Sequence, residues 1–292
     1  MRDNDCLLKF VNIANLCIEL GHWPSHFKTS NTIVISKPNK STYDSPKSYW
    51  PIVLLNMIGK LFEKMIGEQL QFHTISNNFI HQSQLGRLKQ RSITDANVAL
   101  THTICSGWVK NLITSTLTFD ISQFFPSLNH QLLPLILDKI GLDCKVSNFF
   151  KNYLVGWKTQ YYNNFIPPSF NINVGVGQDS VLLPILSALY LSPIFHFLEK
   201  HLKNLKIPIS LISFVNDGLF VSQNKSILHS NVNLFCSYNI MFSLLSKIDL
   251  IIEHSKTDIF HFSRAHGCST LLHSIYLLSA VLCSFPKISE DI

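Results

Sequence analysis

The first part of the chain contains one segment with a strand-like composition and one in which hydrophobic positions recur at the spacing of a helix. The β-branched run 31–36 ends at the basic turn 37–40, which indicates a strand followed by a loop. Apolar residues then recur at helical spacing, with Lys60, Glu63, Lys64 and Glu68 off the stripe, which predicts an amphipathic helix. The stripe that this helix would bury consists of Met57, Ile58, Leu61, Phe62, Met65, Ile66 and Leu70.

The later part of the chain alternates between strand and helix patterns. Residues 117–121 read as a buried strand, and residues 131–140 as a helix that ends at Gly141. The apolar runs 209–215 and 218–221 are separated only by Asn216 and Asp217, which predicts a tight β-hairpin with this polar pair at its tip. This order of elements predicts an α+β fold.

One uncharged run, residues 181–198, approaches the length of about 18 apolar residues that is typical of a membrane span. Pro184, Pro193 and several polar residues interrupt it, and no basic flank precedes it. We therefore expect a buried helix and no membrane association.

Composition and charge narrow the class of protein. With 292 residues and 46% hydrophobic residues, the chain can bury a sizeable core, which excludes a disordered or fibrous protein. The charged fraction of 14% is below the roughly 25% of ordinary soluble domains, so the surface is either unusually polar and neutral or covered by a missing partner domain. Between residues 28 and 110, ten Lys and Arg face four Asp and Glu, which equals the whole net charge of +6. This basic segment suits a phosphate backbone, and a solvated basic face is the alternative.

The seven cysteines are odd in number and scattered, without a CxxC pair or a zinc-ligand spacing. The N-terminus lacks the basic and apolar regions of a secretory signal. Both features predict an intracellular protein that is not secreted.

Two aspartates carry the candidate chemistry. Asp120 follows a predicted strand and Asp217 lies at the predicted hairpin, an arrangement that two-metal nucleotidyl transfer requires. Each signal has an ordinary explanation, because Asn-Asp-Gly is a favoured turn and a strand-end Asp is often a cap or a surface residue.

The two aspartates lie within a series of five sequence motifs. In chain order these motifs are 47–55, 84–95, 119–128, 175–180 and 214–217. In this order they resemble the reverse transcriptases of non-LTR retrotransposons over nearly the whole chain. The resemblance implies a right-hand polymerase fold whose antiparallel palm sheet packs on helices. It implies an N-terminal segment and fingers at 1–116, a palm at 117–263, and an aberrant tail at 264–292 with the thumb missing.

The resemblance also implies roles for individual residues. The catalytic positions would be Asp120, Asn216, Asp217 and Lys256, the metal ligands Asp120, the Ile121 carbonyl, Asn216 and Asp217, and the nucleotide-binding positions Phe125, Gln178, Lys37 and Lys60. The implied cofactor is a pair of Mg²⁺ ions, and the implied partners are an RNA template, a DNA primer and dNTPs. Core packing is the alternative role of Phe125.

Three residues depart from the pattern of this family. Trp50 replaces an arginine, Asp179 replaces a glycine and adds a negative charge near phosphates, and Asn216 replaces a metal-binding aspartate. We therefore expect RNA-templated DNA synthesis that is impaired, with a catalytically dead protein that binds RNA or a hybrid duplex as the alternative. The tail lacks the expected charged and aromatic segments, so our hypothesis is a frameshift after Gly267. The resemblance places the protein in the nucleus or cytoplasm and leaves its oligomeric state open.

Overall fold

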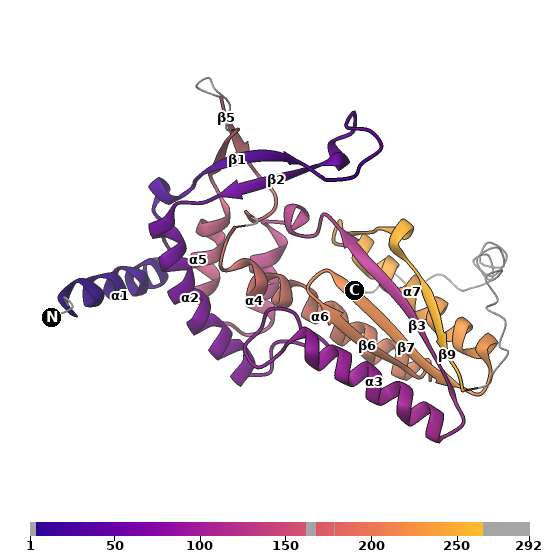
Figure 1. Cartoon of the computed structure of the whole chain (residues 1–292). Helices are drawn as coiled ribbons and strands as arrows, with labels where there is room; N and C mark the ends of the chain where they lie inside the picture. Colours follow the sequence, from indigo (N-terminus) through magenta and orange to yellow (C-terminus); the bar gives the residue numbers. More distant parts are fainter. Residues whose placement is uncertain (1–3, 162–167, 178, 265–292) are drawn as a thin grey trace.

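The protein folds into two sheets with helices packed around and between them (Figure 1). The structure is a computed structural model that describes residues 4–161, 168–177 and 179–264. The helices are α1 (Asn4–Glu19), α2 (Met57–Ser76), α3 (Ile93–Val109), α4 (Leu132–Lys139), α5 (Cys144–Leu154), α6 (Leu183–Asn204) and α7 (Ile227–Ser246). The strands are β1 (Thr29–Ser36), β2 (Tyr49–Leu54), β3 (Ile113–Ser122), β4 (Trp157–Tyr161), β5 (Ser169–Ile172), β6 (Ile209–Phe214), β7 (Asp217–Asn224), β8 (Ile251–Ile252) and β9 (Ile259–Phe262).

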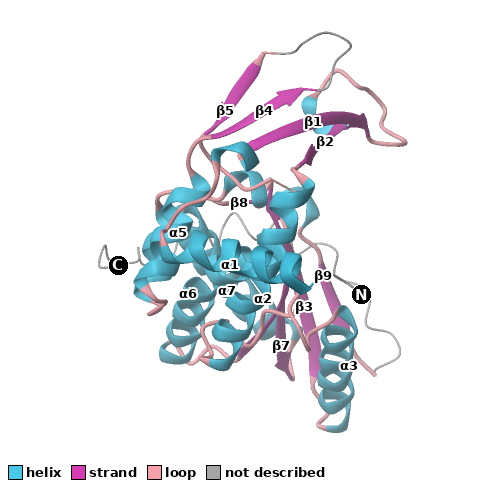
Figure 2. Ribbon diagram, turned by 90° about the vertical axis from the view of Figure 1, so that its left-hand side faces the viewer, coloured by secondary structure: helices cyan, strands magenta, loops and turns pink. Residues whose placement is uncertain are grey.

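The first sheet has the strand order β2-β1-β4-β5 and stands at one end of the molecule, beyond the helices (Figure 2). The predicted strand at 31–36 is confirmed as part of β1, which pairs antiparallel with β2. On its other side β1 pairs parallel with β4, for example Thr29 with Lys158. Strands β4 and β5, which lie in the range predicted for the palm, thus share a sheet with β1 and β2.

The second sheet has the order β6-β7-β3-β8, and β9 also pairs with β3. The predicted strand at 117–121 is confirmed within the longer β3. The predicted tight hairpin is confirmed as well, but Phe214 pairs with Asp217, so the two turn residues are Val215 and Asn216. Val215 has a φ of 62°, the sign that two-residue hairpin turns favour at their first central position.

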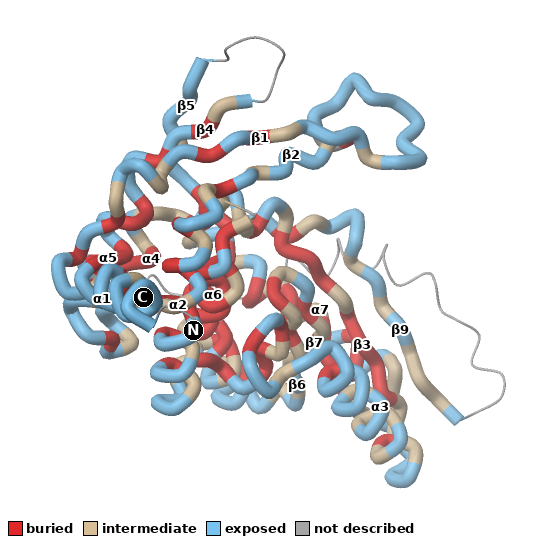
Figure 3. Tube along the Cα trace, turned by 60° about the vertical axis from the view of Figure 1, so that its left-hand side comes forward, coloured by how far each residue is buried: buried red, intermediate tan, exposed pale blue. Residues whose placement is uncertain are grey.

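The core lies between the second sheet and the helices, and buried residues line β3 and α6 (Figure 3). The uncharged run 181–198 forms most of α6 and is largely buried, as predicted. Among the described residues, no helix is both long and apolar enough to cross a membrane. The helix predicted at 131–140 is confirmed as α4, and Gly141 follows it with a φ of 86°.

Helix α2 is confirmed, but the face predicted to be buried is partly wrong. Met57, Ile58 and Leu61 are exposed, whereas Glu63, predicted to lie off the stripe, is buried. The buried face consists of Gly59, Phe62, Glu63, Ile66, Gly67, Leu70 and Thr74. The helix is rotated toward this face because its two glycines allow close packing against Phe27 and Leu182.

Gly218 permits the close packing of β7 on β3, and its replacement by alanine is expected to destabilise the protein by about 1–3 kcal/mol. A Cβ atom at this position would lie 2.0 Å from Cζ of Phe119, a buried ring of the core. Urea unfolding of Gly218→Ala measures the loss. Ser222→Ala is the control on the same strand, because the Ser222 hydroxyl is buried without a hydrogen-bond partner. Equal unfolding midpoints for the two variants would contradict this packing.

Candidate active site

The second sheet brings three predicted catalytic positions, Asp120, Asn216 and Asp217, together at one end of β3. In the β3–β7 register, Asp120 lies opposite Asp217. The turn residue Asn216 is next to both, and its backbone carbonyl accepts a hydrogen bond from the Ile121 N–H at 3.0 Å. Asp120 is buried, Asn216 is half-buried and Asp217 is exposed.

Both carboxylate oxygens of Asp120 have hydrogen-bond donors. The Asn216 side-chain amide donates to Oδ1 of Asp120 at 2.6 Å. The Lys256 ammonium donates to Oδ2 and forms an ion pair with it. Lys256 reaches this place because β8 pairs with β3, and the backbone N–H of Glu253 then donates to the Asp120 carbonyl at 2.8 Å.

The charges of this group affect one another. Although Asp217 is exposed by surface area, the protein around its carboxyl group removes part of the water and raises its pKa. The negative charge of Asp120 raises this pKa further, while Lys256 lowers it. The pKa of Lys256 is raised, chiefly because its ammonium donates to Asp120. Lys256 therefore remains a cation at neutral pH, and its positive charge compensates part of the negative charge of the two carboxylates.

The predicted turn at 175–180 lies against the segment that follows β3. The Gly175 N–H donates to the Leu128 carbonyl at 2.8 Å, and the Val176 N–H donates to the Phe125 carbonyl at 3.1 Å. Gly175 has a φ of 81°, and a Cβ atom there would lie 2.5 Å from the carbonyl oxygen of Pro126. Only glycine fits this conformation and spacing without strain.

Two predicted nucleotide-binding positions belong to these segments of the sequence: Phe125 follows β3, and Gln178 falls within 175–180. The Phe125 ring is half-buried and packs against Phe124 and the core, so the alternative of core packing describes its present contacts. Its role as a gate stays a prediction. Gln178 lies outside the described residues, and its predicted contacts stay predictions as well.

Asp179 joins this turn to α2. Its carboxylate forms an ion pair with the Lys60 ammonium at 2.7 Å and accepts a hydrogen bond from the Leu55 N–H at 3.3 Å. One departure from the family pattern thus pairs with a lysine predicted to bind nucleotide. While this pair persists, the positive charge of Lys60 is largely neutralised.

Lys37 and Trp50 meet on the first sheet, at the end where β1 and β2 join. The Lys37 ammonium lies 6.0 Å from the centre of the Trp50 ring, within the range of a cation–π interaction. Trp50 keeps about half of its surface exposed (49%).

The segment 83–86, within the predicted fingers motif, supports the hairpin from its outer side. The Leu85 N–H donates to the Ser213 carbonyl at 2.8 Å, and the Ser213 N–H donates to the Ser83 carbonyl at 2.8 Å. A Cβ atom at Gly86 would lie 2.5 Å from the Val215 nitrogen. Gly86 therefore allows the chain to pass directly beside the turn that presents Asn216.

Glu63 is a site-supporting residue that sequence reasoning missed. Its buried carboxylate accepts hydrogen bonds from the Tyr153 hydroxyl at 2.6 Å, the Ser180 hydroxyl at 2.9 Å and the Val181 N–H at 3.0 Å. Burial raises its pKa, and these hydrogen bonds oppose the rise. The available signal was Gly59 and Gly67, four residues to either side, which mark this face of α2 as the closely packed one.

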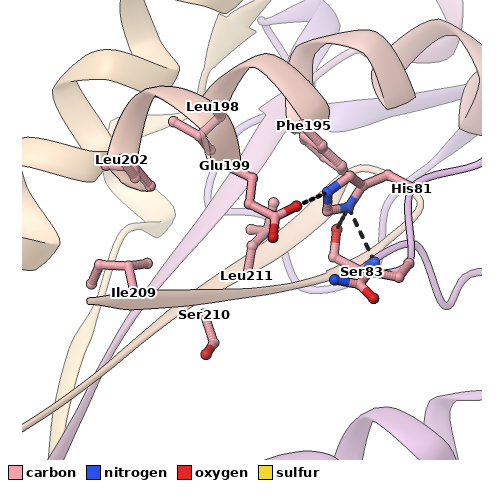
Figure 4. Close-up of a pocket in the computed structure, with 10 residues that line it drawn as sticks. His81, Ser83, Phe195, Leu198, Glu199, Leu202, Ile209, Ser210 and Leu211 are labelled. Atoms are coloured by element: carbon pink, nitrogen blue, oxygen red, sulfur yellow. Dashed lines mark hydrogen bonds and ion pairs between the residues drawn. The ribbon is translucent and has the colours of Figure 1, made fainter. Parts of the chain in front are cut away.

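A cavity of about 150 Å³ lies between α6 and β6 and shares no residue with the predicted site (Figure 4). His81 borders it, and its ring nitrogens lie 2.7 Å from the Ser83 hydroxyl and 3.0 Å from the Glu199 carboxylate. Burial lowers the pKa of His81, and Glu199 opposes this effect. The contact between His81 and Glu199 holds the segment before Gln84 against α6.

The sequence of this chain is similar to those of known reverse transcriptases. The family described as "Reverse transcriptase (RNA-dependent DNA polymerase)" matches residues 35–276. The chain is 26% identical over 185 residues to "Probable RNA-directed DNA polymerase from transposon X-element" of Drosophila melanogaster. It is 27% identical over 188 residues to "RNA-directed DNA polymerase from mobile element jockey" of Drosophila funebris. These matches cover 63% and 64% of this chain, which spans about a fifth (20%) of the length of either relative.

Solved structures agree on the fold. The apo telomerase of Candida tropicalis, truncated from its C-terminal domain, superposes with a TM-score of 0.60 at 14% sequence identity. The match covers 84% of this chain and 52% of the telomerase chain. The predicted α+β right-hand polymerase fold is thus confirmed. The predicted tail lies outside the described residues except for Arg264, and the frameshift hypothesis falls on that part.

Proposed function

Because the chain belongs to the reverse transcriptase family, as a reverse-transcriptase-like protein of retrotransposon type, we propose that it binds an RNA template and is impaired in DNA synthesis. The observation that carries the proposal is the arrangement at Asp120, where Asn216 and Lys256 donate to the two carboxylate oxygens. Asp217 completes a polymerase-like corner that has two aspartates instead of the expected three. A DNA primer and dNTPs are the further proposed substrates, and the nucleus or cytoplasm the proposed location.

The fit of this corner to metal ions supports impairment. Membership of the family implies the use of divalent ions in general, and Mg²⁺ in a pair is the form that the resemblance implies. The residues present fit such a pair poorly, because both oxygens of Asp120 are engaged and Asn216 turns its amide nitrogen toward them. Among the described residues, no group of three or more His, Cys, Asp or Glu side chains could hold a metal ion.

The first sheet supplies a surface that suits single-stranded RNA. Lys37 lies beside Trp50, and Tyr161 and Phe170 form an exposed edge-on pair on β4 and β5. Exposed aromatic rings stack on unpaired bases, and lysines near them neutralise phosphates. We propose that template RNA lies along this sheet.

Replacing Lys37 by alanine is expected to weaken RNA binding and to lower the slope of log affinity against log salt by about one. The physical reason is the loss of one ammonium that neutralises a phosphate. Fluorescence anisotropy with a labelled single-stranded RNA over a salt series measures both quantities. Lys145→Ala is the control, because Lys145 is an exposed lysine at the start of α5. An equal slope for both variants would contradict a phosphate contact at Lys37.

Primer extension separates the impaired polymerase from the catalytically dead alternative. The chain is incubated with RNA template, DNA primer, dNTPs and Mg²⁺ or Mn²⁺, with Asp120→Ala as the background control. RNA binding with extension above this control but slower than that of Asn216→Asp supports the impaired polymerase, extension as fast as that of Asn216→Asp contradicts impairment, and RNA binding without extension supports the dead RNA-binding protein. Absence of salt-dependent RNA binding would exclude both.

A further inference from the structure

The carboxylate of Asp120 is neutralised by groups of the chain itself. Asp120 has a side chain only 9% exposed, at the end of β3, and its two donors come from separate elements. Asn216 belongs to the turn between β6 and β7, and Lys256 ends the short helical turn His254–Lys256 after β8. Three distant segments of the sequence thus converge on one carboxylate.

This convergence satisfies Asp120 without an external cation. A buried charge is costly unless it is paired and hydrogen-bonded, and here a cation and a neutral amide donate one bond to each oxygen. An aspartate at position 216 would instead add a second acceptor beside Asp120, with no proton to donate at neutral pH. Two carboxylates at that spacing repel each other unless a cation lies between them.

We propose that Asn216 and Lys256 together take the place of a divalent cation at Asp120, so that the chain folds without one and has no tight divalent-cation site at this corner. The inference rests on the same two contacts as the proposed impairment, but it concerns folding and ion binding, and its tests measure neither RNA binding nor DNA synthesis. It predicts that position 216 decides whether stability depends on divalent ions.

Thermal unfolding of the full chain tests this prediction in EDTA and in millimolar MgCl₂ or MnCl₂, with ionic strength held constant by KCl. The melting temperature of the unmodified chain is expected to be the same in all three solutions. Asn216→Asp is expected to melt at a lower temperature in EDTA and to gain stability with the logarithm of ion concentration. Asn171→Asp is the matched control, because it adds the same charge at an exposed position of β5.

Titration of Mn²⁺ into the unmodified chain, monitored by calorimetry, provides a second measurement that does not depend on the folding of Asn216→Asp. The expected result is that Asp120→Asn does not change the binding of Mn²⁺, because the unmodified chain has no saturable site at Asp120. Saturable binding that Asp120→Asn abolishes would overturn the proposal, and binding that survives Asp120→Asn would place the ion elsewhere and support it. A melting temperature of Asn216→Asp that is indifferent to ions, in a folded variant, would also overturn it.

Discussion

Replacing Asn216 by aspartate is expected to raise the rate of primer extension by about tenfold to a thousandfold. A unit charge about 4 Å from another contributes on the order of 4 kcal/mol at an effective dielectric of about 20. Each 1.36 kcal/mol of transition-state stabilisation corresponds to about a tenfold change in rate, so a full charge is worth roughly three orders of magnitude. The substitution also removes the amide that now donates to Oδ1 of Asp120. The gain should fall short of the full value because Lys256 stays paired with the other oxygen.

The measurement is single-turnover extension of a DNA primer on an RNA template, with Asn216→Asp compared to the unmodified chain. The same substitution combined with Asp120→Ala is the control, because it keeps the new charge and removes its partner. An equal rate for Asn216→Asp and the unmodified chain would contradict the view that this position limits DNA synthesis. Asp179→Gly, which frees Lys60 from its ion pair, would then be the next variant to measure.

Replacing Glu63 by alanine is expected to destabilise the protein by about 2–4 kcal/mol, because hydrogen-bond donors lose their acceptor and a cavity remains. The buried carboxylate is the acceptor for the Tyr153 hydroxyl, the Ser180 hydroxyl and the Val181 N–H. Its removal leaves the Ser180 hydroxyl and the Val181 N–H without this acceptor, whereas the Tyr153 hydroxyl keeps the Ser180 hydroxyl as a partner at 3.1 Å. Each buried unsatisfied donor costs about 1–3 kcal/mol before the structure relaxes. Urea unfolding measures the loss.

Glu68→Ala is the control for this prediction, because Glu68 is an exposed glutamate on the same helix. Its removal is expected to change stability by less than about 0.5 kcal/mol, as is usual for surface positions. Glu63→Gln keeps the volume but presents an amide group to a donor, so it is expected to lie between the two. A Glu63→Ala variant as stable as Glu68→Ala would show that the three hydrogen bonds contribute little.

The pattern of the sequence predicts which residues form helices and strands better than it predicts which of their side chains are buried. The hairpin around Asn216 followed from a polar pair between two apolar runs, and its pairing follows from local turn geometry. The rotation of α2 did not follow, because it depends on what packs against Gly59 and Gly67 from distant parts of the chain. Glu63 was predicted to lie off the buried stripe because a charged residue is rarely buried unless it is paired, and its partners are about 90 or more positions away.

The candidate site shows the same limit. The order of motifs and the resemblance led to the expectation that Asp120 and Asp217 meet, and the β3–β7 register brings them opposite each other. Neither the direction of the Asn216 amide nor the pairing of Lys60 with Asp179 could be predicted, because each depends on the position of a distant side chain. Residue types predict which chemistry is available, whereas long-range packing decides which donors and acceptors meet.

The parallel pairing of β1 with β4 has a consequence for how the chain folds. Thr29 in β1 pairs with Lys158 in β4, so formation of the first sheet closes a loop of more than a hundred residues. The first sheet should therefore form late in folding. During synthesis, the β1–β2 hairpin leaves the ribosome before its partner exists and presents an open strand edge together with exposed side chains such as Val34 and Ile35. Fragments that end before β4 should therefore aggregate, and chaperones that bind nascent chains should find a target in residues 29–54.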